Sequence, residues 1–163
     1  MELELEFTYE ASLAAPLMIG AGPYGTRAYF EVAEGKVKGD RINGTFVGGA
    51  GDWLLIGSDG WARLDVRSQV QTDDGAVLYL TYYGVLELTE TVMTATRTMA
   101  EETDFGDQYF RITPRLESGD ERYGWVNHTV LVGRGRLIPG GAAYEVLPDH
   151  LDAAPNQSSG RLS

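Results

Sequence analysis

The sequence contains no cysteine and only two histidines. The absence of cysteine excludes disulfide bonds, thiolate catalysis, cysteine-ligated zinc and iron–sulfur clusters. His128 and His150 alone offer little for an imidazole metal site, and a Ser-His-Asp triad would lack a suitably placed base. We therefore expect a protein without metal or cofactor, with an all-oxygen site near Asp73 and Asp74 as the weaker alternative.

Positive charge is also scarce, because 13 Lys and Arg stand against 24 Asp and Glu, for a net charge of −11. This balance disfavours nucleic acid and anionic membranes as partners, since both attract a positively charged surface. No apolar stretch approaches bilayer length, and residues 1–7 lack the basic start and the apolar run of a secretory signal. We expect a soluble, cytoplasmic protein that binds a small molecule and self-associates into a homo-oligomer.

The 163 residues suit one domain with a core of its own. Residues 1–148 contain the ordered patterns described below. From residue 149 onward the composition turns to Pro, Asn, Gln, Ser and Gly, which predicts a flexible tail over 149–163.

Apolar and polar residues alternate with a period of two along much of the chain, which is typical of half-buried strands. The pattern predicts strands over residues 2–9, 26–32, 45–47, 53–56, 61–72, 76–91, 107–116, 122–133 and 143–147. Only residues 93–102 suit a short helix or an irregular loop. Many short strands with little helix predict an all-β fold, a closed antiparallel barrel that is calycin- or lipocalin-like in general architecture. Because several strands have a polar second face with aromatic residues, we expect the barrel to enclose a polar-aromatic cavity.

The segment from residue 61 to residue 71 has two different faces, because successive side chains of a strand point to opposite sides. One face carries Trp61, Arg63, Asp65, Arg67, Gln69 and Gln71, and the other carries Ala62, Leu64, Val66, Ser68 and Val70. If exposed, the charged face is an ion-pair ladder of small energetic value. If enclosed, its charges must be hydrogen-bonded to one another and indicate function. We expect enclosure, with the apolar row on an outer surface that a neighbouring subunit covers.

Similar polar faces occur on three other predicted strands. They carry Tyr79 and Tyr83, then Tyr109, Arg111 and Glu117, and finally Tyr123, Trp125 and Asn127. Converging inside a barrel, these side chains would form an aromatic pocket with a few fixed polar groups, as in small-molecule sites. The alternative for any one of them is a core residue with its polar tip at the rim.

Two glycine-rich stretches need separate interpretation. Residues 20–25 match a dinucleotide fingerprint, but the continuation is β-prone where that motif requires a helix, so we interpret it as a turn between strands. Residues 48–53 present Asp52 and Trp53 after four small residues. They form either the rim of a site or a loop in which Asp52 caps its own backbone and Trp53 joins the core.

The order of short motifs also resembles a known family. The motifs are Ile19-Gly20, Pro23, Gly25-Thr26-Arg27, Gly48-Gly49, Asp52-Trp53, Asp59-Gly60, Leu64-Asp65-Val66-Arg67, Thr72-Asp73-Asp74-Gly75-Ala76, Gly84, Tyr109-Phe110-Arg111, Pro114, Glu117-Ser118 and Tyr123-Gly124-Trp125-Val126-Asn127. Together they resemble the domain of unknown function 3237 family over nearly the whole chain except the tail. The resemblance implies a closed, often self-associated antiparallel barrel, and the family has no generally established activity. Ala50-Gly51 makes one loop a residue longer than the family pattern, and Val126 replaces a Leu.

We expect a cofactor-free enzyme that isomerises or cyclises a medium-sized oxygenated molecule, such as a polyketide- or terpenoid-like secondary metabolite. Arg67 and Arg111 are the expected oxyanion donors, and Asp65 or Glu117 the general base. A carboxylate between arginines is a poor base, which favours Glu117. The expected binding residues are Trp53, Arg63, Tyr79, Tyr83, Tyr109, Tyr123, Trp125 and Asn127. The alternatives are a non-catalytic carrier or sensor, and a structural oligomer without a cavity.

Overall fold

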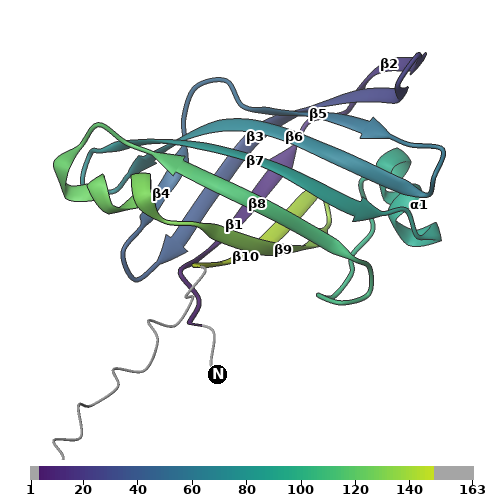
Figure 1. Cartoon of the computed structure of the whole chain (residues 1–163). Coiled ribbons are helices and arrows are strands. Elements are labelled where there is room, and N and C mark those ends of the chain that lie inside the picture. The colour runs from purple at the N-terminus through teal and green to yellow at the C-terminus, as the bar shows by residue number, and fades with distance from the viewer. Residues whose placement is uncertain (1–3, 149–163) are drawn as a thin grey trace, which may run out of the picture.

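The structure is a computed structural model that describes residues 4–148. Its strands are β1 (Phe7–Leu13), β2 (Leu17–Gly22), β3 (Gly25–Gly39), β4 (Asn43–Phe46), β5 (Gly51–Ile56), β6 (Trp61–Thr72), β7 (Val77–Glu87), β8 (Phe110–Glu117), β9 (Leu131–Ile138) and β10 (Gly141–Pro148). The helix α1 spans Glu90–Thr98, and the 3-10 helix η1 spans Glu121–His128. These two helices lie at opposite ends of the strands (Figure 1).

The strands close into an antiparallel barrel (Figure 1). The sheet runs β1-β10-β9-β8-β7-β6-β4-β3, and pairing of β1 with β3 closes it, with Tyr9 opposite Val37. β5 fills the space between β3 and β6 next to β4, so the barrel has eight strand positions. The predicted closed antiparallel β-barrel is confirmed.

One face of every barrel strand is apolar and points inward. In β6, Ala62, Leu64 and Val66 are at most 4% exposed. They pack in one core cluster with residues of the other strands, among them Leu80 and Ile112. An eight-stranded barrel is just wide enough for side chains to fill, so the apolar faces bury one another at its centre.

The turns follow the predicted glycines. Gly60 (φ 86°) and Gly75 (φ 94°) take positive φ in the loops on either side of β6, a conformation that side chains with a Cβ rarely adopt. The glycine-rich stretch over residues 20–25 is the hairpin turn between β2 and β3, as predicted, and no helix follows it.

α1 confirms the helical alternative for the segment after β7. The Val92 amide donates to the N-cap Thr89 Oγ1 at 3.2 Å, which satisfies one free amide of the first turn. The helix ends at Met99, which takes a left-handed conformation (φ 57°). Neither helix of the described part of the chain is long and apolar enough to cross a bilayer.

The strand predicted over residues 122–133 is wrong. Its first part is η1, which the Asp120 side chain caps by accepting from the Arg122 amide, and its last part belongs to β9. Asn127 holds the helix back against the end of β8, because its side chain exchanges two hydrogen bonds with the Ser118 backbone. The strand at β2 is absent from the sequence prediction. The predicted tail over residues 149–163 lies outside the described residues.

Candidate functional site

The polar face of β6 lies on the outside of the barrel, so the prediction that it is enclosed is wrong. Arg63 and Arg67 are exposed, and the Arg63 guanidinium pairs with Asp59 at 2.6 Å in the preceding turn. The apolar row that was predicted to face a neighbouring subunit fills the barrel instead. The physical reason is the desolvation cost, several kcal/mol for each buried unpaired ion, whereas burying the aliphatic row is favourable.

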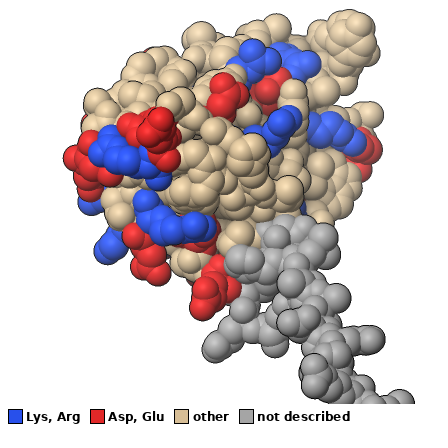
Figure 2. Space-filling model, turned by 60° about the vertical axis from the view of Figure 1, so that its left-hand side comes forward, with Lys and Arg blue, Asp and Glu red and all other residues tan. Residues whose placement is uncertain are grey.

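The neighbouring strands repeat this arrangement. Tyr79 and Tyr83 on β7 are 40% and 67% exposed, Tyr109 before β8 is 48% exposed, and Arg111 and Glu117 on β8 also face outward. Six predicted site residues do converge, on an open hollow of about 710 Å³ on the outer face: Asp65, Arg67, Tyr79, Tyr83, Glu117 and Asn127. Figure 2 shows Lys and Arg next to Asp and Glu across one side of the molecule, without one large patch of either sign.

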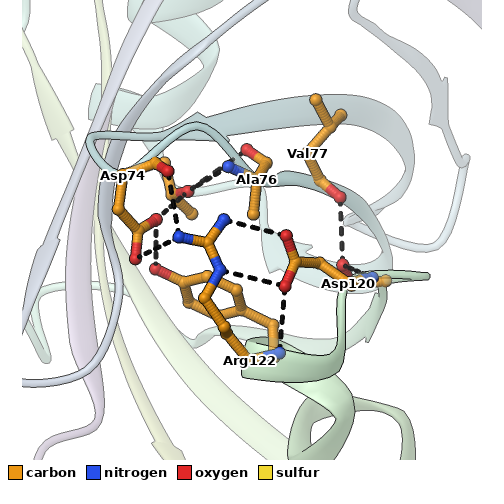
Figure 3. Close-up of polar contacts among 8 residues, drawn as sticks. Asp74, Ala76, Val77, Asp120 and Arg122 are labelled. Atoms are coloured by element: carbon orange, nitrogen blue, oxygen red, sulfur yellow. Dashed lines mark hydrogen bonds and ion pairs between the residues drawn. The ribbon is translucent and has the colours of Figure 1, made fainter.

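The predicted site residues of η1 hold the fold together. The Tyr123 hydroxyl donates to Asp74 Oδ1 at 2.8 Å, and Arg122 bridges Asp120 (2.9 Å) and Asp74 (3.5 Å), tying η1 to the β6–β7 turn (Figure 3). The Arg122 guanidinium holds the pKa of Asp120 at about 2. The same contacts place Tyr123 at the end of the barrel, buried and away from the outer hollow.

The two predicted tryptophans do not line a cavity inside the barrel, although Trp125 packs against the edge of the core. Trp53 is 41% exposed and packs on the Tyr29 ring at 5.0 Å between centroids. Trp125 stacks under the Arg41 guanidinium at 3.5 Å, and Arg41 makes a bidentate pair with Glu6. Trp53 is therefore not a core residue, which was one interpretation of residues 48–53, and it is not part of an enclosed site either.

A small cavity lies inside the barrel, where α1 covers one end. Its volume is about 80 Å³. The walls are mainly aliphatic and aromatic. They include Phe30, Asp52, Leu54, Leu64, Leu86, Phe110 and Tyr144 from the strands, and Val92, Ala95 and Thr96 from α1 together with its C-cap residue Met99. Asp52 and Glu101 are the only carboxylates among these described lining residues.

Asp52 faces this cavity because it pairs with Phe30 and Val66, whose side chains are buried, and a gap in the β5–β6 ladder lies next to it. The strands pair at Gly51 with Arg67 and Asp52 with Val66, and pairing resumes only at Leu55 with Arg63. In the unpaired stretch the Asp65 amide donates to Asp52 Oδ1 at 3.0 Å, so a side-chain oxygen takes the place of a strand carbonyl.

The Asp52 carboxyl has a strongly perturbed acidity. Burial raises its pKa from 3.8 to about 7, the Asp65 amide hydrogen bond opposes this rise, and the negative charge of the Asp65 carboxylate adds to it. Burial acts this way because a low-dielectric environment disfavours the charged form. Near neutral pH this carboxyl is thus present both with and without its proton, which suits a group that exchanges protons.

Three buried tyrosines stand beside it. The rings of Tyr9 and Tyr144 stack with centroids 4.5 Å apart, and Tyr82 lies 6.1 Å from Tyr9 and 5.7 Å from Tyr144. Burial raises the pKa of all three hydroxyls well above 10, and the charge of Asp52 is a further cause for each. Tyr144 lines the same cavity as Asp52. Neutral hydroxyls of this kind are hydrogen-bond donors.

The Tyr9 hydroxyl is an exception to the rule that buried polar groups are satisfied. It lies close enough to Tyr82 for the two groups to shift each other's pKa. No atom of residues 4–148 is nevertheless within hydrogen-bonding geometry of the Tyr9 oxygen. The interior therefore holds one spare buried donor in addition to the Asp52 carboxyl.

Comparison with known proteins identifies the family. The family model described as "Protein of unknown function (DUF3237)" matches residues 1–147. The chain belongs to the DUF3237 family. A UPF0311 protein from Clostridium acetobutylicum is 29% identical over 139 residues, which cover 84% of this chain and 87% of that protein.

Solved structures agree on the fold of this DUF3237 chain. A beta-barrel like protein from Acinetobacter baumannii is 27% identical, with a TM-score of 0.76 over 90% of this chain and 94% of the other. A structure described as an enzyme from Penicillium herquei has a TM-score of 0.64 over 90% and 93% of the two chains. At 18% identity, that second likeness concerns the fold alone.

The candidate site residues of this DUF3237 chain that were not predicted as site residues from the sequence are Asp52 and the interior tyrosines. The glycine-rich stretch before Asp52 did carry a signal, since one of its two interpretations was the rim of a site. Gly51 is needed there because a Cβ would collide with the Tyr29 ring. Within residues 4–148 no three His, Asp or Glu side chains gather closely enough to hold a metal ion. Independence from cofactors stays a prediction.

Proposed function

We propose that this DUF3237 protein is a cofactor-free enzyme of isomerase or cyclase type, with Asp52 as its acid–base group. The observation that carries the proposal is the Asp52 carboxyl on an apolar cavity, with a pKa raised to about 7 by burial. Perturbed carboxyls in enclosed sites are characteristic of proton-transfer chemistry. The substrate class is an oxygenated small molecule, such as a polyketide- or terpenoid-like metabolite.

The chemistry follows from the positions of the groups. The deprotonated Asp52 takes a proton from a carbon next to a substrate carbonyl, or from a hydroxyl, and returns it at another position. The Asp65 amide fixes Oδ1, so the second carboxylate oxygen is the one that transfers the proton. Tyr144 lines the cavity, and its neutral hydroxyl can donate to the oxyanion that forms. The aliphatic walls exclude water from the intermediate.

The cavity is small, so the proposal requires that α1, which forms part of its wall, can move. Pockets for small molecules usually measure about 300–1,000 Å³, whereas this cavity holds about 80 Å³. A medium-sized substrate therefore enters only when α1, which supplies Val92, Ala95, Thr96 and Met99 to the walls, moves outward. A helix held by one buried residue, Val92, is suited to such movement.

A non-catalytic carrier is the second candidate function. It is favoured by the mainly apolar lining of the cavity, which binds a hydrophobic molecule without any chemistry. The two functions differ in whether the Asp52 proton is exchanged with the bound molecule.

Hydrogen–deuterium exchange at carbon tests the proposal without knowledge of the natural substrate. Cyclopentanone and 1-indanone are incubated with the protein in D₂O at neutral pH, and deuterium next to the carbonyl is followed by NMR. We expect exchange above the buffer rate for the wild type and at the buffer rate for Asp52→Asn. Asp65→Asn and Glu117→Gln, which alter carboxylates of the outer hollow, are the matched controls and should retain exchange.

The outcomes separate the candidates. Equal exchange by wild type and Asp52→Asn, or no exchange with either ketone, argues against proton transfer by Asp52. A rise in the melting temperature with 1-indanone, unchanged in Asp52→Asn and without exchange, would favour the carrier. Loss of exchange in Glu117→Gln would indicate that proton transfer takes place on the outer face of the barrel, where Glu117 lies.

A further inference from the structure

The hairpin of β2 and β3 forms an arm that projects from the barrel (Figure 1). Four of its large apolar side chains face solvent: Leu17, Met18, Ile19 and Tyr24 are 64%, 60%, 65% and 79% exposed. They follow one another within eight residues of the chain. Single exposed apolar residues are ordinary, but a contiguous group of this size marks an interaction surface.

The arm also lacks the charged side chains that normally protect an exposed strand, although a bulge between Met18 and Gly20 interrupts the pairing of β2 with β3. β2 is the last strand in the order of the sheet, with β3 as its partner on one side and no strand of the described chain on the other. Edge strands are usually guarded by charged side chains. Residues 11–26 contain no charged residue, although 23% of the whole chain is charged. This edge is thus open to pairing.

We propose that the arm is a dimerisation element, on which β2 of one chain packs edge to edge against β2 of a second copy. An antiparallel pair of identical strands around a two-fold axis needs only one kind of surface, which the arm supplies. Pro16 and Pro23 flank β2 and limit the paired stretch to Leu17–Gly22, since proline cannot donate to a ladder.

Charge favours a second copy over other occupants. Each chain carries a net charge of −11, so two chains repel one another over most of their surfaces. The uncharged arm is the segment where two copies approach without this repulsion. A membrane is disfavoured because the arm has no lysine or arginine before Arg27 to bind anionic head groups.

The base of the arm is continuous with the wall of the barrel cavity. Met18 and Pro16 line an outer pocket together with Phe30 and Thr96. Phe30 and Thr96 also line the interior cavity, so the arm and α1 meet at this point. The dimer contact therefore lies beside α1, although the inference of a dimer does not depend on the proposed chemistry.

The absence of cysteine allows a direct test. An Ile19→Cys variant has a single thiol, and the two-fold arrangement brings it next to its copy. Mild oxidation should then give a disulfide-linked dimer. The matched control is Val132→Cys, which places a thiol at a 46% exposed position on β9 and should remain largely uncrosslinked.

Solution mass gives the second measurement. Light scattering of the wild type at micromolar concentration should give twice the 17.8 kDa of one chain, and Ile19→Lys should give one chain, with Val132→Lys unchanged from wild type. A monomeric wild type, a dimer that persists in Ile19→Lys, or equal crosslinking of Val132→Cys would overturn the proposal. Flotation of a monomeric wild type with phosphatidylcholine vesicles would overturn it in favour of a lipid partner.

Discussion

Asp52 and Asp65 lie on opposite sides of the barrel wall, joined by one hydrogen bond of 3.0 Å from the Asp65 amide to Asp52 Oδ1. The Asp65 side chain lines the outer hollow, whereas Asp52 lines the interior cavity. Two residues of the same type in neighbouring strands thus have different environments, and burial raises the pKa of Asp52 to about 7. Because of this difference, which the amino-acid composition does not show, Asp65 is a surface carboxylate and Asp52 is the candidate acid–base group.

The raised pKa of Asp52 predicts a loss of stability on going from acidic to neutral pH. The folded chain keeps the proton up to pH about 7, whereas the unfolded chain releases it near 3.8. Between these values the folded state binds more protons, so the free energy of unfolding falls as pH rises. The cost is at most roughly 4 kcal/mol.

Urea denaturation at several pH values measures this effect as the difference between wild type and Asp52→Asn. The difference cancels the contributions of other groups, such as Asp120, whose lowered pKa acts in the opposite direction. We expect Asp52→Asn to gain stability relative to wild type as pH rises from 4 to above 7. A constant difference across this range would show that Asp52 titrates normally.

The Tyr9 hydroxyl predicts a stabilising substitution. It is buried, and no partner in the described part of the chain meets hydrogen-bonding geometry, although Tyr82 is close enough to shift its pKa, so the folded protein loses the hydration of this group for at most a weak interaction. Removing it in Tyr9→Phe should raise the free energy of unfolding by about 1 kcal/mol. Tyr82→Phe, which removes the hydroxyl of another tyrosine in the same cluster, is the variant with which its stability is compared. A melting temperature lowered by Tyr9→Phe would indicate that the hydroxyl is bonded in solution.

Much of the fold can be predicted from the alternation of side chains, but the direction of each face cannot. The pattern of residues 61–71 correctly predicts a strand, and the same pattern fits either face inward. Arg63, Asp65 and Arg67 lie outside because burying three charges costs more than the apolar row gains. The tyrosines of β7 and Tyr109 before β8 suggested a cavity wall, yet aromatic residues with polar tips suit an outer face equally well.

The candidate site was harder to predict because its members come from distant strands. Tyr9, Tyr82 and Tyr144 belong to β1, β7 and β10, and only barrel closure brings their rings together. Asp52 was visible in the sequence as an acid after a glycine-rich loop. Its inward direction depends on its pairing with Phe30 and Val66, and its hydrogen bond on the gap in the β5–β6 ladder, neither of which the sequence pattern reveals.

Tyr144 predicts a selective loss of activity. Of the three clustered tyrosines, Tyr144 alone lines the cavity, so its hydroxyl is the expected donor to a substrate oxyanion. Loss of one such donor typically costs about 10²–10³ in rate. Tyr144→Phe should therefore reduce the ketone exchange rate by tenfold or more, while Tyr9→Phe, outside the cavity lining, should leave it close to wild type. Equal rates in Tyr144→Phe and wild type would exclude the hydroxyl from the reaction.

The inner face of α1 predicts how the cavity can be closed. Val92, Ala95, Thr96 and Met99 follow the spacing of one helix face and line the cavity. Ala95→Leu adds three carbon atoms to this wall and fills much of the available space, so ketone exchange should fall at least tenfold. Because the added atoms are apolar and enter an existing void, the urea midpoint should stay near the wild-type value.

Thr91→Leu is the matched control, since Thr91 is exposed on α1 and does not line the cavity. If Ala95→Leu lowers the urea midpoint by overpacking, Ala95→Val makes the same test with one carbon fewer. Full exchange in a stable Ala95→Leu variant would place the reaction outside the cavity, whatever the acidity of Asp52. Loss of exchange in Ala95→Leu but not in Thr91→Leu would instead link the reaction to the space between α1 and Asp52.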